Sequence, residues 1–200
     1  MARRSHPPLA KLTRPRLHRV LMRERLFDRM DEARSEGAGI CVVGPPGAGK
    51  TTLVASWLQE RQIPGIWYQV DPGDADLATF FHYLMRACGP ARKGQRQLPA
   101  FTPEFAVDTS GFARRYFRLL FERMPPGSVL ALDNYQEVPA SSAFHGVIVE
   151  ALREVPPGLQ LIAISRRDPP DCYARLVANR QVATLDWDEL RLTSEEARAI

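Results

Sequence analysis

The sequence predicts an α/β domain in which a parallel β-sheet lies between helices. Three observations predict this class. Short apolar runs alternate with amphipathic segments, as in a sheet whose strands are connected by helices. Proline and glycine residues separate these segments. The 200 residues, 44% hydrophobic and 25% charged, suit one globular domain with a substantial buried core.

Each apolar run predicts a strand, and each amphipathic segment predicts a helix. The first helix, for example, places Leu26, Phe27 and Met30 on one face. A stretch rich in Gly, Pro, Gln and Arg, 89–103, predicts a surface loop. The expected strands are 40–43, 66–70, 129–132, 161–164 and 182–185, and the expected helices are 23–33, 50–61, 76–87, 108–123 and 141–154.

The first strand leads directly into a phosphate loop of the form G-x-x-x-x-G-K-[ST]. A strand, a glycine-rich turn and a helix in this order aim backbone N–H groups and the positive helix end at one anionic point. A nucleoside triphosphate fits this geometry, whereas the alternative is an ordinary glycine-rich turn that carries a lysine. The expected phosphate-binding residues are Gly44, Pro45, Pro46, Gly47, Ala48, Gly49, Lys50, Thr51 and Thr52.

Two residues of this loop have specific expected roles. Lys50 supplies a fixed positive charge to the β- and γ-phosphates, and the Thr51 hydroxyl holds a Mg²⁺ ion that bridges them. Asp133 follows the apolar run 129–132 and is expected at the carboxyl edge of the sheet, where open α/β sheets bind ligands. Asp133 is therefore predicted to hold the same Mg²⁺, usually through a water molecule.

The next residue, Asn134, bears on hydrolysis. Many hydrolysing proteins of this kind have a second acid at this position that activates water, and an amide cannot accept a proton near neutral pH. The sequence therefore predicts slow or absent ATP hydrolysis. Arg166 follows the fourth strand and is predicted to contact the γ-phosphate, in preference to Arg167. The alternative for both arginines is a solvated basic turn.

The positive charge of the chain is concentrated at its start. The chain carries a net charge of +4, but its first 25 residues carry eight Lys or Arg against the single acid Glu24, which leaves −3 on the other 175. Such an arm can contact nucleic acid, but no aromatic residues are interleaved with its charges. We therefore expect a solvated arm and no direct DNA contact by this chain.

The sequence also bears on the cellular location of the protein. No apolar stretch has the length of a membrane span, and the first residues do not resemble a signal peptide. Cys41, Cys88 and Cys172 have neither paired nor metal-like spacing, which indicates reduced thiols without a role. A cytoplasmic protein is expected.

The last residues predict a helix that has only begun. Thr193 and Glu196 form a capping-box pattern, with four residues after it. A helix needs about ten residues to offer a packing face, so we expect the natural protein to continue. The expected division is a basic arm and short helix (1–34), a nucleotide-binding domain (35–190), and the start of a helical domain (191–200).

Together these motifs resemble the nucleotide-binding domain of STAND-class signalling ATPases, in particular the large ATP-binding LuxR-type transcriptional regulators of the maltose-regulon-activator type. The resemblance extends over nearly the whole chain. It rests on the phosphate loop and on five further segments: Lys11 to Pro15 with Arg23 to Leu26; Trp67, Tyr68, Asp71 and Asp74; Leu132 to Tyr135; Ser165 and Arg166; and Leu192, Thr193, Glu196 and Ala197.

The resemblance implies a P-loop NTPase fold with five parallel strands in the order 5-1-4-3-2. It also implies a switch in which ADP holds a resting form, while ATP and an inducer permit self-association and transcription activation. Arg23 would lie near the adenine or ribose. The inducer- and DNA-binding parts would lie beyond Ile200.

Two departures and three rival functions qualify this picture. Asn134 replaces the acid that is usual in the family, and Gln136 stands where a histidine is common. A P-loop kinase usually has its phosphate loop near the amino terminus and an arginine-bearing lid, neither of which is evident. An AAA-type ATPase normally needs a paired acid where Asn134 stands. An interaction module that has lost nucleotide chemistry would not need Lys50 and Thr51.

Overall fold

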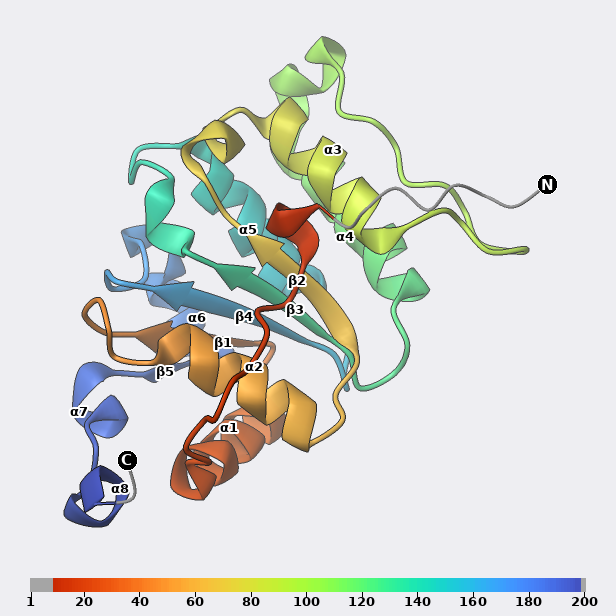
Figure 1. The fold of residues 1–200 in the computed structure, drawn as a ribbon. Coiled ribbons are helices and arrows are strands. Elements are labelled where there is room, and N and C mark those ends of the chain that lie inside the picture. Colours follow the sequence, from red (N-terminus) through yellow and green to blue (C-terminus); the bar gives the residue numbers. More distant parts are fainter. Residues whose placement is uncertain (1–8, 199–200) are drawn as a thin grey trace.

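The computed structural model describes residues 9–198, which fold around one parallel sheet of five strands (Figure 1). The strand order is β2-β3-β4-β1-β5, which is the predicted order read from the opposite edge. The predicted fold class is therefore confirmed. The strands are β1 (Gly39–Val43), β2 (Gly65–Gln69), β3 (Val129–Asp133), β4 (Gln160–Ser165) and β5 (Val182–Leu185).

Helices cover both faces of the sheet (Figure 1). On one face lie α1 and α2, and on the other lie α3, α4 and α5. Three short helices complete the chain on the β5 side. The helices are α1 (Glu24–Glu36), α2 (Lys50–Glu60), α3 (Leu77–Cys88), α4 (Thr109–Arg123), α5 (Ala143–Glu154), α6 (Ala174–Ala178), α7 (Trp187–Leu190) and α8 (Ser194–Arg198).

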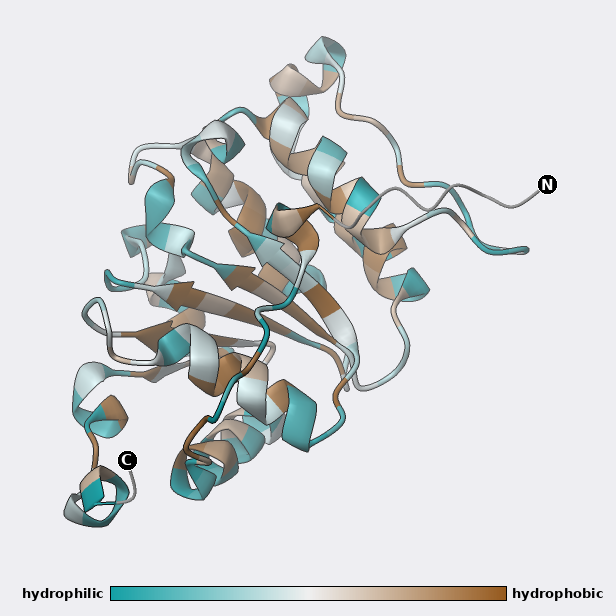
Figure 2. Cartoon of the chain, in the orientation of Figure 1, coloured by the Kyte–Doolittle hydropathy of each residue, from teal (hydrophilic) through white to brown (hydrophobic). Residues whose placement is uncertain are grey.

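The core is divided between the two faces because successive strand residues point to opposite sides. In β1, Ile40 and Val42 pack against α1 and α2, whereas Cys41 and Val43 pack toward α3 to α5. Every residue of β1, β3 and β4 is buried, as expected for parallel strands covered on both faces. Figure 2 shows these strands as a hydrophobic centre within more hydrophilic helices.

The register of the strands brings the predicted site residues to one edge. Val43, the last residue of β1, pairs with Ser165 of β4, and Leu132 of β3 pairs with Ala163 of the same strand. The phosphate loop, Asp133 and Arg166 therefore all follow strand ends at the carboxyl edge of the sheet.

Most predicted elements begin and end within two residues of the observed ones, and the strand 182–185 agrees at both ends. The expected turn 71–74 is part of a 3₁₀ helix, η2 (Pro72–Ala75). The sequence did not predict α6 and α7, which have five and four residues. Helices this short complete hardly more than one turn, so they leave no repeat of apolar residues to detect.

The segment before α1 packs against the domain. A 3₁₀ helix, η1 (Ala10–Leu12), lies against β2, and the chain then crosses α2 before it enters α1 (Figure 1). Lys11 forms ion pairs with Asp71 and Asp74, so the expectation of a purely solvated arm is wrong for this residue. Arg3 and Arg4 of the predicted arm lie outside the described residues.

The predicted capping box at the last helix is present. The Thr193 hydroxyl accepts a hydrogen bond from the Glu196 amide, and the Glu196 carboxylate accepts one from the Thr193 amide. The helix that follows, α8, is described only to Arg198. The division of the chain at residues 34 and 190 stays a prediction. Among the residues described, no helix has the length and apolar character needed to cross a membrane.

Candidate functional site

The loop between β1 and α2 bends sharply at two glycines before the helix begins. Gly47 and Gly49 have φ angles of 79° and 76°, in the left-handed region that glycine adopts without strain. Gly49 is the N-cap of α2 and offers no side chain to the first amides of the helix. These amides and the positive helix end are therefore available to an anion.

Lys50 lies over the loop that precedes it. Its ammonium donates hydrogen bonds to the carbonyl oxygens of Gly44 at 2.6 Å and Pro45 at 2.8 Å. Burial lowers the pKa of Lys50, the Arg166 charge lowers it further, and the Asp133 charge opposes both. The loop itself thus fixes the position of this positive charge beside the free amides of α2.

Thr51 and Asp133 face each other across the site. The Thr51 hydroxyl donates a hydrogen bond of 2.9 Å to Asp133 Oδ1, which also accepts one from the Asn134 amide. Burial raises the pKa of the Asp133 carboxyl, while these two hydrogen bonds and the Lys50 charge oppose the rise. Two hard oxygen ligands from two elements are what Mg²⁺ needs when phosphates and water complete its shell. These residues therefore fit the ion.

The described residues contain no cluster of three metal-ligating side chains. Mg²⁺ is commonly held by one or two protein ligands together with substrate phosphates. Thr51 and Asp133 would then hold the ion only together with the bound phosphates.

Asn134 occupies a backbone position that favours asparagine. Its φ of 59° and ψ of 37° are left-handed, a conformation that asparagine tolerates better than most residues. Its backbone amide is bonded to Asp133, so the residue shapes the turn that leaves β3.

A pocket of about 330 Å³ unites most of the predicted site residues. We call it the phosphate pocket. Arg166 lines it and Arg167 does not, which favours the predicted choice between the two. The role of Arg166 toward the γ-phosphate stays a prediction. The lining residues are Pro46, Gly47, Gly49, Lys50, Thr51, Thr52, Asp133, Asn134, Gln136, Ile164 and Arg166.

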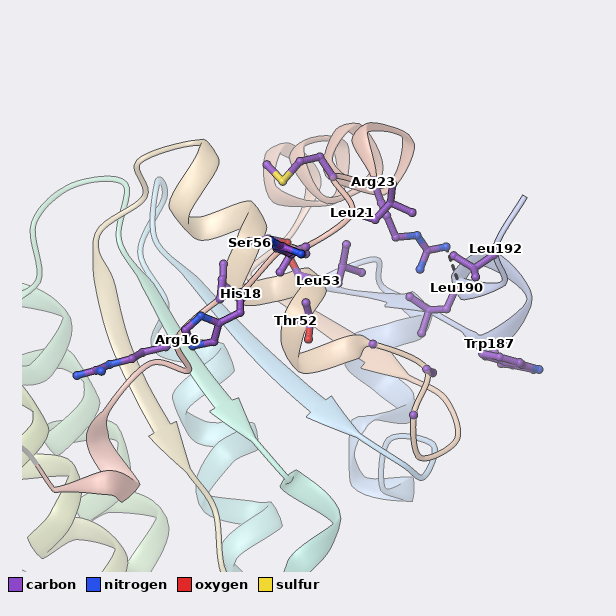
Figure 3. A pocket seen from close by; sticks show the side chains of 17 residues that line it. Arg16, His18, Leu21, Arg23, Thr52, Leu53, Ser56, Trp187, Leu190 and Leu192 are labelled. Atoms are coloured by element: carbon purple, nitrogen blue, oxygen red, sulfur yellow. Dashed lines mark hydrogen bonds between the residues drawn. The ribbon is translucent and has the colours of Figure 1, made fainter. Parts of the chain in front are cut away.

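A larger cavity of about 990 Å³ adjoins the phosphate pocket. We call it the flanking cavity. It lies between residues 16–23, the phosphate loop and the first turns of α2, and the segment from Trp187 to Leu192 (Figure 3). Gly47, Gly49 and Thr52 line both spaces, so the two lie side by side at the start of α2.

Arg23 borders the flanking cavity, but its guanidinium is directed toward the end of the chain. Nη2 donates to the carbonyl oxygens of Leu190 and Arg191 and to the Glu196 carboxylate (Figure 3). Nε is buried without a hydrogen-bond partner. Arg23 is therefore placed beside the cavity and outside the phosphate pocket, and its contact with adenine or ribose stays a prediction.

Sequence reasoning missed the rest of the flanking cavity. Leu17, Leu21 and Trp187 line it together with Ser56 of α2. Residues 14–22 form neither helix nor strand, so no periodicity marks them as a binding surface. The only signal in the sequence was the resemblance around Arg23.

The chain is similar in sequence to a known transcriptional regulator. The chain is 30% identical over 193 residues to the HTH-type transcriptional regulator MalT of Cronobacter sakazakii. The match covers 94% of this chain and 21% of that protein, so the chain spans about a fifth of the relative's length. No family model matches the sequence.

Solved structures share the fold. The STAND protein with a tetratricopeptide repeat sensor from Pyrococcus horikoshii matches with a TM-score of 0.55 and 16% identity, over 92% of this chain and 25% of that one. A Walker-type ATPase of Pyrococcus abyssi matches at 0.53 and 14%, over 88% and 55%. The ORC1 protein of Aeropyrum pernix, solved in complex with DNA, matches at 0.55 and 13%, over 90% and 48%.

The sequence match and the structural matches indicate the same class of protein. The sequence match extends over nearly the whole chain, and the structural matches are to P-loop ATPases. The chain is therefore a P-loop ATPase domain of the MalT-like type, with the fold that STAND proteins share.

Proposed function

We propose that this domain binds ATP and ADP with Mg²⁺ and acts as a nucleotide-dependent switch within a transcriptional regulator. The observation that carries the proposal is the placement of Lys50, Thr51 and Asp133 around the free amides of α2. This arrangement supplies a cation, two metal ligands and a helix end at one anionic point.

Each group has a distinct task in this proposal. The loop amides and Lys50 bind the β- and γ-phosphates, while Thr51 and Asp133 hold Mg²⁺. The bound ion would neutralise phosphate charge and orient the triphosphate. Arg166, which lines the same pocket, reports whether a γ-phosphate is present. The flanking cavity receives the nucleoside, with Arg23 at its border.

Hydrolysis by this site is slow in our proposal. Asp133 is the single carboxylate among the residues that line the phosphate pocket, and Thr51 and the Asn134 amide already engage it. Asn134 cannot serve as a general base. Slow hydrolysis suits a switch better than fast hydrolysis, because the ATP-bound form then persists.

The wider role extends beyond this chain. We propose that an inducer and DNA bind regions of a longer, cytoplasmic regulator that follow this domain, and that the ATP-bound form self-associates. The support is the similarity to MalT, an HTH-type transcriptional regulator. In such a regulator this domain binds the nucleotide, and other regions bind the inducer and the DNA.

The test is a titration of the protein with fluorescent ATP and ADP analogues, with and without Mg²⁺. We expect both nucleotides to compete for one site and Mg²⁺ to strengthen ATP binding. The switch is then tested on the full regulator by measuring its mass in solution with each nucleotide. Absence of nucleotide binding would refute the site, and equal association with ATP and ADP would refute the switch.

A further inference from the structure

Gln136 connects the ends of two strands at the rim of the phosphate pocket. Its side-chain Oε1 accepts a hydrogen bond of 3.0 Å from the Arg166 amide, which follows β4. Its Nε2 donates a hydrogen bond of 3.0 Å to Glu137 Oε1. A primary amide has two donor hydrogens and two acceptor lone pairs. One of each is therefore left to a ligand.

Gln136 lies between two cavities and lines both of them. It lines the phosphate pocket with Lys50 and Asp133, and it also lines an adjoining cavity of about 460 Å³ with Glu137 and Arg166. Gln136 thus separates the expected γ-phosphate from an open, water-accessible region. A water molecule that attacks the γ-phosphate from this side must pass its amide.

The backbone at Gln136 is held firmly by its neighbour. The Tyr135 side chain is buried, and its hydroxyl lies 2.8 Å from the Tyr173 hydroxyl and 3.0 Å from His145 Nδ1. His145 Nε2 lies 3.0 Å from the Pro139 carbonyl oxygen, to which it must donate. This chain of hydrogen bonds fixes both ends of the turn 135–139, so the Gln136 amide is already positioned before nucleotide binds.

We propose that Gln136 orients the attacking water for hydrolysis of the γ-phosphate, and that Glu137 positions the Gln136 amide. This inference rests on the proposed function. An amide that orients water without deprotonating it is an established device in phosphoryl transfer. It suits a pocket whose lining contains one carboxylate, Asp133, which already accepts hydrogen bonds from Thr51 and the Asn134 amide.

The step balances without a protein base. The water oxygen forms a bond to the γ-phosphorus while the bond between that phosphorus and the β–γ bridging oxygen breaks, and ADP leaves with the electron pair. One water proton passes to a γ-phosphate oxygen, so ATP⁴⁻ and water give ADP³⁻ and H₂PO₄⁻. Gln136 Oε1 accepts a hydrogen bond from the water throughout and neither gains nor loses a proton.

The test measures phosphate release in single turnover and nucleotide affinity on the same variants. Gln136→Ala should slow hydrolysis roughly 10–100-fold, as expected when a reacting group loses its positioning, with ATP affinity changed less than about twofold. Glu137→Ala should also slow hydrolysis, but Glu137→Gln should retain it because an amide oxygen still accepts from Gln136 Nε2. Gln97→Ala, in an exposed loop, is the matched control.

Each outcome bears on one claim. The role of Gln136 would be overturned if the wild-type chain hydrolysed ATP no faster than Lys50→Ala. It would also be overturned if Gln136→Ala hydrolysed ATP at the wild-type rate. Loss of hydrolysis in Glu137→Gln would make Glu137 a general base and contradict its positioning role. If the unchanged chain binds no Mg·ATP, the proposed function itself fails.

Discussion

The Thr51 hydroxyl and the Asp133 carboxylate are joined by a hydrogen bond of 2.9 Å, although 82 positions separate them in the sequence. Thr51 belongs to the first turn of α2 and Asp133 ends β3. The parallel sheet brings them together because it gathers the ends of its strands at one edge. The two oxygens therefore lie together without a bound nucleotide, as the proposed metal site requires.

The first prediction concerns this pair. Asp133→Asn keeps an oxygen that accepts from Thr51 but removes the charge that attracts Mg²⁺. The gain in ATP affinity caused by Mg²⁺, measured as the ratio of affinities in Mg²⁺ and in EDTA, should fall roughly 10–100-fold. Asp168→Asn, an exposed acid beyond β4, is the control. A ratio unaffected by Asp133→Asn would remove this residue from the metal site.

Arg166 should discriminate between ATP and ADP. If its guanidinium bonds the γ-phosphate, Arg166→Ala removes a charge-assisted hydrogen bond and should weaken ATP binding by about tenfold. ADP binding should change less than about twofold. Titration calorimetry with both nucleotides measures this, and Arg167→Ala, which does not line the pocket, is the comparison. Equal losses for ATP and ADP would contradict a sensing role.

Lys11 should stabilise the domain through Asp74. The Asp74 side chain is fully buried, and it accepts hydrogen bonds from Lys11 at 2.8 Å, the Tyr68 hydroxyl and the Asp71 amide. Lys11→Met leaves this carboxylate without a cation and should lower the free energy of unfolding by about 2–3 kcal/mol.

Urea denaturation measures the Lys11 effect, and the chain offers a matched control. Lys93 lies exposed in the loop between α3 and η3 (Pro103–Asp108), so Lys93→Met should change stability by less than about 0.5 kcal/mol. Similar effects of the two substitutions would show that the ion pair with Asp74 contributes nothing.

His145 should make stability depend on pH. Burial lowers the pKa of His145 in the folded chain, and its hydrogen bond to Pro139 opposes the shift. Below about pH 6.5 the unfolded chain therefore takes up a proton that the folded chain does not, and stability falls as pH falls. His145→Gln should reduce this loss between pH 7.5 and 5.5 in urea titrations. A slope unchanged by His145→Gln, with exposed His82→Gln as the control, would contradict the assignment.

The sequence predicted the strands and the phosphate loop well because their signals are local. A run of four or five apolar residues bounded by proline or glycine predicts a buried strand. The phosphate loop is recognised from consecutive residues of the sequence. Asp133 could be found because its place follows from the end of a strand. The order of the strands needed the family resemblance, since it depends on contacts between distant residues.

The flanking cavity and the Lys11 ion pairs could not be predicted in the same way. Residues 16–23 and Trp187 meet only because β5 returns the chain to the phosphate loop. Lys11 and Asp74 each belong to a segment that resembles the family, but neither segment indicates that the two side chains contact each other. Such pairings are products of the tertiary structure, for which short patterns carry no information.

The most direct test of the nucleotide site is the thermal unfolding of the chain with and without Mg·ATP. At about 100 times the dissociation constant, a bound ligand stabilises a protein by about 2.7 kcal/mol, which corresponds to roughly 5–10 °C for a chain of this size. Lys50→Ala should abolish the shift, whereas Lys93→Ala should retain it. A shift of the same size in Lys50→Ala would contradict the account.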